Sequence, residues 1–343
     1  MRAAYYERKG PAHDVISIGE LPDPEPGTGE VRVRVMASGV NPSDTKNRGG
    51  WGGYKDMPYP MIVPHNDGAG VIDAVGPGVP KSRLGERVWL YEAQRDGRAF
   101  GTAADFVIAS ERKAVRLPEA ASFELGACLG VPAMTAHRCL FADGRLQGQT
   151  VLVHGGGGAV GHAAIQLARW AGAFVITTVS RPEQAQAARD AGAQVIIDRG
   201  REDVVGRILE ATSGAGVDRV VEVSFEANLE TNLKVLKVGG VIATYATGQA
   251  DSAPTIPFYR LIFQSITMRF VLVYVMSEEA HMAAARDIND AIEAGALRPF
   301  IGRRFSLADL AAAHDLQDSG EVVGNIVINV EGRDGEAATD QVG

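Results

Sequence analysis

The first third of the chain alternates apolar and polar residues over short distances, as half-buried strands do. Val31–Val35 alternates valine with arginine, and further short apolar runs are separated by glycine and charged turns: Asp67–Gly76, Arg87–Tyr91 and Ala104–Ile108. Short strands bounded by turn residues are typical of antiparallel sheets. We therefore predict a barrel-like antiparallel β domain over residues 1–123.

The pattern then changes to continuous apolar runs that alternate with amphipathic segments. Such runs between helices indicate βαβ units and a parallel sheet that is covered on both faces. Six of them match the two halves of a doubly wound, dinucleotide-binding fold. The predicted strands are Thr150–His154, Phe174–Val179, Gln194–Asp198, Asp218–Val223, Gly240–Ala246 and Ile266–Val275. The chain is thus of the α/β class, with this second domain over residues 124–268.

The remaining segments are two helical patterns, Ser277–Ala294 and Leu307–Ser319, and a short apolar run, Asn325–Val330. They cannot extend the six-stranded unit without a further crossover. We therefore expect residues 269–330 to return to the first domain, which becomes discontinuous in sequence. Residues 331–343 are polar without periodicity, so we predict a flexible tail.

Composition narrows the classes of partner. The chain has 343 residues and a formal net charge of −8, and an acidic chain repels phosphate backbones, so we expect no nucleic-acid partner. No run approaches the roughly 18 apolar residues of a membrane span, and the N-terminus lacks the apolar core of a signal peptide. The two cysteines, Cys128 and Cys139, match no metal-ligand spacing and favour reduced thiols. We expect a cytoplasmic protein.

A glycine-rich turn follows the first strand of the second domain. It contains Gly156-x-Gly158-x-x-Gly161, preceded by an apolar strand and followed by a helical pattern over Val160–Ala171. Glycines let the backbone approach a diphosphate closely, and the helix start offers free N–H groups to the anion. The alternative is a flexible loop. We predict dinucleotide binding by Gly156, Gly157, Gly158, Ala159, Val160 and Gly161.

The end of the next strand distinguishes NAD from NADP. An acidic residue there would hold the ribose 2′-hydroxyl, but this strand ends in Ser180 and Arg181. A guanidinium can donate several hydrogen bonds to a 2′-phosphate, which favours NADPH. Arg199, after the third strand, would reach the same phosphate, although the neighbouring Asp198 argues against it. The alternative for Arg181 is a solvated charge beside a helix.

At this point the sequence resembles the medium-chain dehydrogenase/reductase superfamily, and within it the NADPH:quinone oxidoreductases related to zeta-crystallin. The similarity extends from about residue 3 to 330. Its markers are Ala37–Thr45, Asp67–Gly76, Gly85–Trp89, Val131–Ala136, the glycine turn and Gly324–Ile328. The resemblance implies a GroES-like catalytic domain joined to a six-stranded Rossmann domain.

The zinc alcohol dehydrogenases of that superfamily carry a cysteine ligand at the position of Asn41 and a histidine ligand at the position of Asn66. Asparagine is a poor zinc ligand, and His65 lies one position away, where we interpret it as a loop histidine. We therefore predict no metal. Without a Lewis acid to polarise the substrate, alcohol oxidation is disfavoured.

The acceptor must then take hydride without strong activation. A quinone meets this requirement because aromatisation drives its reduction, and a conjugated enone or enal is the next candidate. Asn41, Trp51 and Tyr54 are the predicted substrate-binding residues. Their alternatives are an Asn-Pro turn and ordinary loop aromatics. The third hypothesis is an NADPH-binding protein with a structural or regulatory role, since the sequence offers no obvious proton donor.

The same resemblance assigns further cofactor contacts. Thr135 would pack near the nicotinamide, and Lys46 would contact the cofactor. The segment Tyr245, Ala246, Thr247 and Gly248 would line the ribose and the nicotinamide, and Phe270, Val271 and Leu272 would offer backbone groups to the carboxamide. Gln184 replaces a lysine that often supports the 2′-phosphate. The apolar strand Phe270–Val275 would be an exposed edge in a monomer, so we expect a homodimer that pairs through it.

Overall fold

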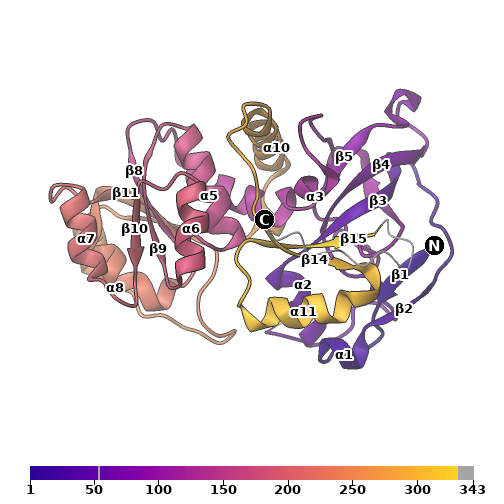
Figure 1. The fold of residues 1–343 in the computed structure, drawn as a ribbon, viewed down its shortest axis with the longest axis horizontal. Coiled ribbons are helices and arrows are strands. Elements are labelled where there is room, and N and C mark those ends of the chain that lie inside the picture. Colours follow the sequence, from indigo (N-terminus) through magenta and orange to yellow (C-terminus); the bar gives the residue numbers. More distant parts are fainter. Residues whose placement is uncertain (53–54, 331–343) are drawn as a thin grey trace.

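Two sheets lie side by side in the computed structural model, which describes residues 1–52 and 55–330 (Figure 1). The parallel-sheet unit is built from the middle of the chain. The mixed-sheet unit is built from the N-terminal third and the C-terminal strands. Helix α10 (Glu278–Glu293) lies between the two.

All six strands of the parallel-sheet unit run in the same direction, in the order β10-β9-β8-β11-β12-β13. Helices α5 and α6 cover one face and α7 and α8 cover the other (Figure 1). The predicted doubly wound sheet is confirmed. The strands are β8 (Thr150–His154), β9 (Phe174–Val179), β10 (Val195–Asp198), β11 (Val217–Glu222), β12 (Leu236–Thr244) and β13 (Thr267–Phe270), and the helices are α5 (Ala159–Trp170), α6 (Pro182–Asp190), α7 (Val204–Ala211), α8 (Phe225–Val235) and α9 (Phe258–Phe263).

The sixth strand is shorter than the sequence predicts. We expected Ile266–Val275 to be continuous, but β13 ends at Phe270 and Val273–Val275 form a 3₁₀ turn, η4. The partner strand runs out at Thr244, whose carbonyl accepts the last ladder bond from Val271 N–H at 2.8 Å. Without a partner the apolar run leaves the sheet, so the prediction of one long strand was wrong.

The C-terminal strands join the N-terminal sheet. Strand β15 pairs antiparallel with β3 and parallel with β14, in the order β14-β15-β3-β4-β5-β7, and β6 also pairs with β3. The strands within residues 1–123 pair antiparallel, as predicted, and the sheet becomes mixed through β14, a strand that the sequence did not predict. The strands are β3 (Glu30–Val40), β4 (Asp67–Val75), β5 (Arg87–Leu90), β6 (Phe106–Ser110), β7 (Ala114–Arg116), β14 (Ile301–Ser306) and β15 (Asn325–Asn329). A small separate antiparallel sheet pairs β1 (Arg2–Tyr5) with β2 (Ser17–Glu20).

Short helices connect these strands and mark the transition to the parallel sheet. They are α1 (Ala12–Val15), α2 (Pro42–Gly49), α3 (Phe123–Gly126), α4 (Met134–Phe141), α11 (Leu310–Ser319), the 3₁₀ turns η1 (Lys81–Arg83), η2 (Glu111–Lys113) and η5 (Leu307–Asp309), and the π-helical turn η3 (Leu129–Ala133). No helix in the described ranges is long and apolar enough to cross a membrane. The domain boundaries predicted at 123/124 and 268/269 stay predictions, and the predicted tail lies outside the described residues.

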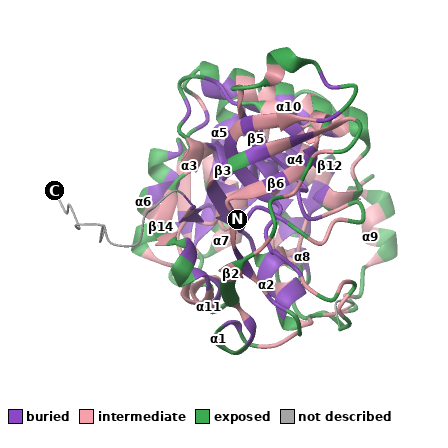
Figure 2. Ribbon diagram, turned by 90° about the vertical axis from the view of Figure 1, so that its right-hand side faces the viewer, coloured by how far each residue is buried: buried purple, intermediate pink, exposed green. Residues whose placement is uncertain are grey.

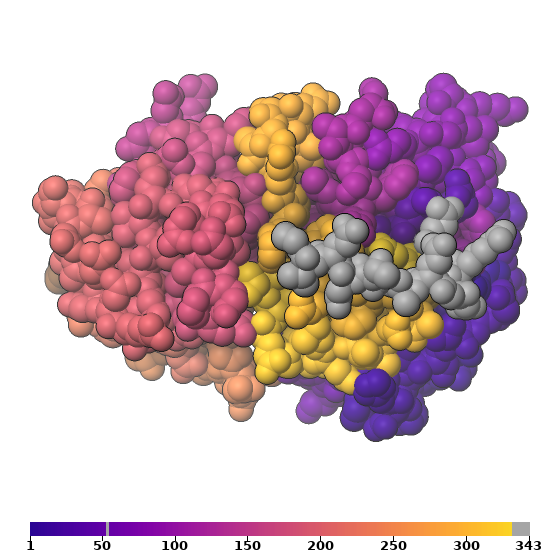
Figure 3. Space-filling view, viewed as in Figure 1, coloured from indigo at the N-terminus to yellow at the C-terminus, as the bar shows by residue number. Residues whose placement is uncertain are grey.

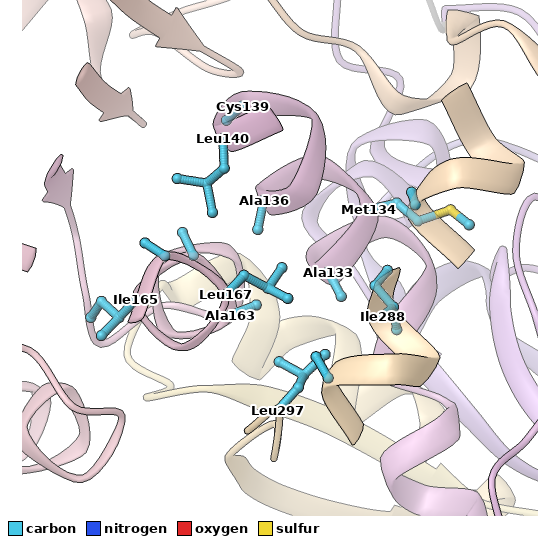
Figure 4. Close-up of a cluster of buried hydrophobic side chains, with 14 of the residues drawn as sticks. Ala133, Met134, Ala136, Cys139, Leu140, Ala163, Ile165, Leu167, Ile288 and Leu297 are labelled. Atoms are coloured by element: carbon cyan, nitrogen blue, oxygen red, sulfur yellow. The ribbon is translucent and has the colours of Figure 1, made fainter. Parts of the chain in front are cut away.

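One hydrophobic cluster joins the two units. Side chains of α4 and α5 meet Ile288 of α10 and Leu297, and Cys139 is buried among them (Figure 4). Helix α10 begins at Ser277, whose hydroxyl accepts a hydrogen bond from Ala280 N–H at 3.3 Å. This capping removes one unpaired N–H group from the helix start. Buried strands and helices fill the interior throughout (Figure 2).

A chain of buried polar groups crosses the mixed-sheet unit. Arg48 Nε lies 3.2 Å from His314 Nδ1, the two Nε2 atoms of His314 and His65 are 2.8 Å apart, and His65 Nδ1 lies 2.8 Å from Ser38 Oγ. Ser38 Oγ in turn lies 2.7 Å from Thr102 Oγ1. Because arginine only donates, His314 accepts at Nδ1 and donates from Nε2, and His65 then accepts at Nε2 and donates from Nδ1. Both rings are thus held neutral.

Protonation of either ring would put two donors face to face. Burial lowers the pKa of His65 to about 3 and, with the charges of His65 and Arg48, also lowers the pKa of His314. The predicted loop histidine is therefore a fully buried member of this chain.

We expect the free energy of unfolding to fall as pH is lowered from about 6.5 towards 3. In this range His65 and His314 become protonated in the unfolded chain but stay neutral in the folded protein. Each histidine adds about 1.4 kcal/mol per pH unit within that window. Urea unfolding at several pH values measures the slope. His314→Gln, which retains an acceptor for Arg48, should make the slope shallower, whereas the exposed control His13→Gln should not. An unchanged slope in His314→Gln would contradict this account.

Candidate functional site

The predicted cofactor segments meet at one edge of the parallel sheet. The glycine turn follows β8, residues 245–248 follow β12 and residues 270–272 end and follow β13. Parallel strands share the edge at which their carboxyl ends lie, and the order of strands reverses between β8 and β11. In doubly wound sheets the crevice at that reversal is where ligands bind.

The glycine turn is packed too closely for side chains. A Cβ at Gly156 would lie 2.2 Å from Thr177 Oγ1, one at Gly157 would lie 2.5 Å from Gln184 Cβ, and one at Gly161 would lie 2.2 Å from the carbonyl oxygen of Gly155. At Gly158 the nearest atom would be 3.5 Å away. The turn therefore presses against β9, α6 and the start of α5 and leaves its Gly158 side open.

Helix α5 begins at this open side. Its first intrahelical bond runs from His162 N–H to Gly158 O at 2.8 Å, and the N–H groups of Ala159, Val160 and Gly161 have no acceptor among the described residues. Free N–H groups at a helix start, reinforced by the helix dipole, bind anions. The cradle therefore fits the diphosphate that the sequence predicts.

The end of β9 packs against the back of the turn. Gln184 Oε1 accepts hydrogen bonds from Ser180 N–H at 3.0 Å and from Ser180 Oγ at 3.1 Å. Arg181 is the N-cap residue of α6, and within the described structure its guanidinium has neither a hydrogen bond nor an ion pair. Arg199 is exposed after β10, which pairs with β9. The residues predicted for the 2′-phosphate therefore end neighbouring strands; that role stays a prediction.

The part of the mixed-sheet unit around α2 is called the facing wall here, and two predicted residues of it, Lys46 and Trp51, contact each other. Lys46 of α2 places its Nζ atom 4.3 Å from the centre of the Trp51 ring, and half-burial lowers the pKa of Lys46. A Cβ at the next residue, Gly52, would lie 3.5 Å from Ala250, so this loop approaches the loop after β12. Tyr54, the other aromatic predicted to bind substrate, lies outside the described residues.

Asn41 is buried and held from two sides. Its backbone N–H donates to Asp44 Oδ2 at 2.9 Å at the start of α2, and its side-chain amide donates to Asp67 Oδ2 at 2.9 Å. Asp67 Oδ2 also accepts from Val131 N–H at 2.8 Å. Asn41 thus has the turn-forming role that we gave as its alternative, and contact with substrate stays a prediction.

Two carboxyl groups lie behind Asn41. Burial raises the pKa of Asp44 to about 6 and, together with the charge of Asp44, raises the pKa of Asp67 well above its usual range. Asn66 donates to Asp44 Oδ1 at 3.0 Å. A Cβ at Gly130 would come within 2.1 Å of Asp67 Oδ1, so this glycine lets η3 close over the carboxyl group.

The other predicted cofactor residues border the shared core. Thr135 is buried in the first turn of α4, and Tyr245 and Val271 pack against the same hydrophobic cluster. Phe225 N–H donates to Ala246 O at 3.2 Å and Glu226 N–H donates to Thr247 Oγ1 at 3.2 Å, which fixes the segment that ends at Gly248. Phe270 and Leu272 are 73% and 54% exposed, so they are open to a ligand or a partner.

A pair of hydroxyl groups between the two units was missed from the sequence. Ser43 Oγ lies 2.8 Å from Tyr274 Oη, and the guanidinium of Arg95 lies 3.7 Å from the Tyr274 ring centre. Burial raises the pKa of Tyr274, so the phenol keeps its proton. The pair can hold and pass on a proton. Because 231 residues separate its members, no local sequence signal could have revealed it.

Comparisons with known proteins agree with this arrangement. The alcohol dehydrogenase GroES-like domain family matches residues 27–119 and the zinc-binding dehydrogenase family matches residues 159–287. The chain is 31% identical to the quinone oxidoreductase of Rattus norvegicus, over 89% of this chain and 90% of the relative, and 29% identical to the 2-haloacrylate reductase of a Burkholderia species, over 96% and 98%. The crystal structure of the Escherichia coli quinone oxidoreductase complexed with NADPH superposes with a TM-score of 0.81 at 25% identity, covering 96% of this chain and all of the other.

The chain belongs to the medium-chain dehydrogenase/reductase superfamily. It is therefore an oxidoreductase that uses a nicotinamide cofactor, and the glycine cradle described above fits that cofactor.

Zinc, which many members of this superfamily bind, does not fit the residues present here. The side-chain NH2 groups of Asn41 and Asn66 donate to Asp67 and Asp44, their amide oxygens are poor zinc ligands, and the Cys128 thiol lies 3.3 Å from the backbone carbonyl oxygen of Glu124. Within residues 1–52 and 55–330, no three His, Cys, Asp or Glu side chains are placed to share a metal ion. We derive no catalytic step through a metal.

We expect Gly161→Ala to lower both stability and cofactor affinity, because its methyl group would meet the backbone oxygen of Gly155, which cannot move aside. The clash should cost about 1–3 kcal/mol of unfolding free energy. Gly158→Ala is the matched control, because its Cβ would lie 3.5 Å from the same oxygen and should cost less than about 1 kcal/mol. Chemical denaturation and calorimetry with the cofactor measure both. Equal losses of unfolding free energy in the two variants would contradict the steric argument.

Proposed function

We propose that this protein transfers a hydride from NADPH to a quinone without a metal ion. The observation that carries the proposal is a dinucleotide cradle that faces a wall whose two metal positions hold asparagines engaged with carboxyl groups. The quinone oxidoreductases among its relatives support the same reaction. A quinone needs no Lewis acid, because aromatisation to the hydroquinone drives the transfer.

The cofactor proposal is NADPH. Ser180 and Arg181 stand where an NAD-binding protein would place a carboxylate, and the guanidinium of Arg181 has no other partner in the described structure. The Escherichia coli quinone oxidoreductase was crystallised with NADPH, which supports the choice.

The bound cofactor supplies the hydride, and the residues of the cleft supply position and a proton. The stacked Lys46 and Trp51 pair offers a flat cationic and aromatic wall to a planar acceptor. The Ser43 and Tyr274 hydroxyl groups would give the proton that completes the hydroquinone. The neighbouring carboxyl groups of Asp44 and Asp67 are themselves buried, so that side of the wall is closed to water.

A second candidate function is the reduction of a conjugated carbon–carbon double bond. The 2-haloacrylate reductase among the relatives favours it, since that substrate is a conjugated alkene. The third hypothesis, a cofactor-binding protein with little turnover, rested on the lack of a proton donor. The Ser43 and Tyr274 pair weakens it.

Incubation of the purified protein with NADPH and small benzoquinones or naphthoquinones should consume NADPH, followed by its absorbance. The same assay with enones, enals and haloacrylates tests the second candidate. Turnover of the alkenes alone would replace the quinone proposal, and binding of NADPH without turnover on any acceptor would favour the third hypothesis. Tyr274→Phe, which keeps the ring over Arg95, should lower kcat about 100-fold while leaving NADPH affinity unchanged.

The same proposal includes a homodimer through the edge of the parallel sheet. Among the described residues no strand pairs with the outer side of β13. Exposed apolar side chains lie on α9, much of which is exposed in Figure 2, and on the neighbouring segments. They include Val238, Phe258, Tyr259, Ile262, Phe263, Phe270, Leu272 and Val275. A large exposed apolar patch beside an unpaired strand is typical of an oligomer interface.

Sedimentation velocity should therefore find twice the 36.3 kDa mass of the chain. Phe263→Asp, at a side chain that is 80% exposed, should shift the protein towards the monomer, because a carboxylate in the apolar contact costs desolvation. Trp170→Asp alters an exposed apolar residue outside this patch and should leave the dimer intact. A wild-type protein that sediments as a monomer would end this part of the proposal.

A further inference from the structure

A cavity of about 530 Å³ lies between the two units, beside the end of β9. Arg181 and Glu183 line it from the parallel-sheet unit. From the mixed-sheet unit it is lined by Phe300, Gly302, Arg303, Leu316, Glu321, Val322 and Val323. On the face seen in Figure 3, the surface of the C-terminal residues (yellow) lies directly against that of the parallel-sheet unit.

This cavity is next to the glycine turn. Gly324, which follows two of its lining residues, donates its N–H to the carbonyl oxygen of Gly157 at 2.8 Å, and Gly324 and Gly158 form an isolated β-bridge. Gly324 itself has a φ of +76° and a Cβ there would lie 2.3 Å from Phe300 O, so only glycine suits the contact. The backbone tie keeps the wall of the mixed-sheet unit against the diphosphate cradle.

Two guanidinium groups line this cavity, one from each unit. Arg181 has no partner in the described structure, and Arg303 donates only to the neighbouring Gly302 O at 3.1 Å. Glu183 and Glu321 share the wall, but neither forms an ion pair with Arg181 or Arg303 there. The adjacent residue on β14 differs: Arg304 makes a two-pronged ion pair with Glu124, at 2.9 Å and 3.0 Å.

The parallel-sheet unit supplies only part of a phosphate site by itself. Gln184, on the first turn of α6, is neutral, and its carbonyl oxygen is engaged with Ser180. A dianionic phosphate is held most strongly by several charge-assisted hydrogen bonds. Arg199 follows the neighbouring strand β10 but does not line this cavity, so the second cation beside Arg181 at the cavity comes from the mixed-sheet unit.

We propose that Arg303 is that second cation and that, together with Arg181, it selects NADPH over NADH by holding the 2′-phosphate between the two units. The inference rests on the proposed cofactor and goes beyond it, because it places a specificity-determining residue on the mixed-sheet unit. A phosphate held from both sides also ties the two units together. NADH, which lacks the 2′-phosphate, makes no such tie.

The test is the dissociation constant of each nicotinamide cofactor, measured by calorimetry on the full-length chain. Arg303→Ala should weaken NADPH binding about 10- to 100-fold and leave NADH binding unchanged. Arg304→Ala removes the neighbouring guanidinium and should change neither constant, and Arg303→Lys should recover part of the NADPH affinity. Thermal unfolding checks that each variant is folded.

The outcomes separate this inference from the proposed cofactor. Wild-type protein that binds both cofactors equally would overturn the NADPH preference and the role of Arg303 together. A wild-type preference for NADPH that survives Arg303→Ala would overturn the role of Arg303 alone. Equal weakening of NADPH and NADH would also overturn it, because the contact would then not be to the 2′-phosphate.

Discussion

The site depends on one constraint: the backbone of the glycine turn packs directly against the segments around it. Gly156, Gly157 and Gly161 touch β9, α6 and the backbone of Gly155 at distances that leave no room for a Cβ. That packing aims the free N–H groups of α5 into the cleft, where the helix dipole reinforces them. It also brings Gly324 of the other unit within hydrogen-bond distance, so the position of the mixed-sheet unit is set from the same turn.

Buried polar groups hold the facing wall in place, and their hydrogen-bond partners fix their protonation states. Asp67 accepts from Asn41 and from the backbone of Val131, and a directional chain through His65 and His314 reaches Thr102, which donates to the Asp67 carbonyl at 2.6 Å. Such a network is stable only when each donor meets an acceptor. Asn41 and Asn66 offer only amide oxygens in place of the thiolate and imidazole that zinc prefers, which directs the proposed chemistry towards acceptors that need no metal.

The cleft is shaped by contacts between units rather than within them. A common core of α4, α5 and α10 joins the units on one side, and the Ser43 and Tyr274 pair, the Trp51 loop and the Arg181 and Arg303 cavity lie where their surfaces meet. Residues on both sides can therefore contact one cofactor. A bound nicotinamide dinucleotide would be long enough to contact residues along the whole boundary between the two units.

The sequence by itself determined the parallel sheet and the glycine turn, because both depend on local patterns. Buried strands are apolar runs, and the turn is a set of glycines between a strand and a helix. It also placed asparagines at the two metal positions. Pairings between distant segments were left to the tertiary structure. Only the fold showed that Asn41 is engaged with Asp67, that the apolar run after Phe270 leaves the sheet where β12 ends, and that Tyr274 meets Ser43. Each of these depends on which strand or loop lies beside it, and that is decided by packing across the whole chain.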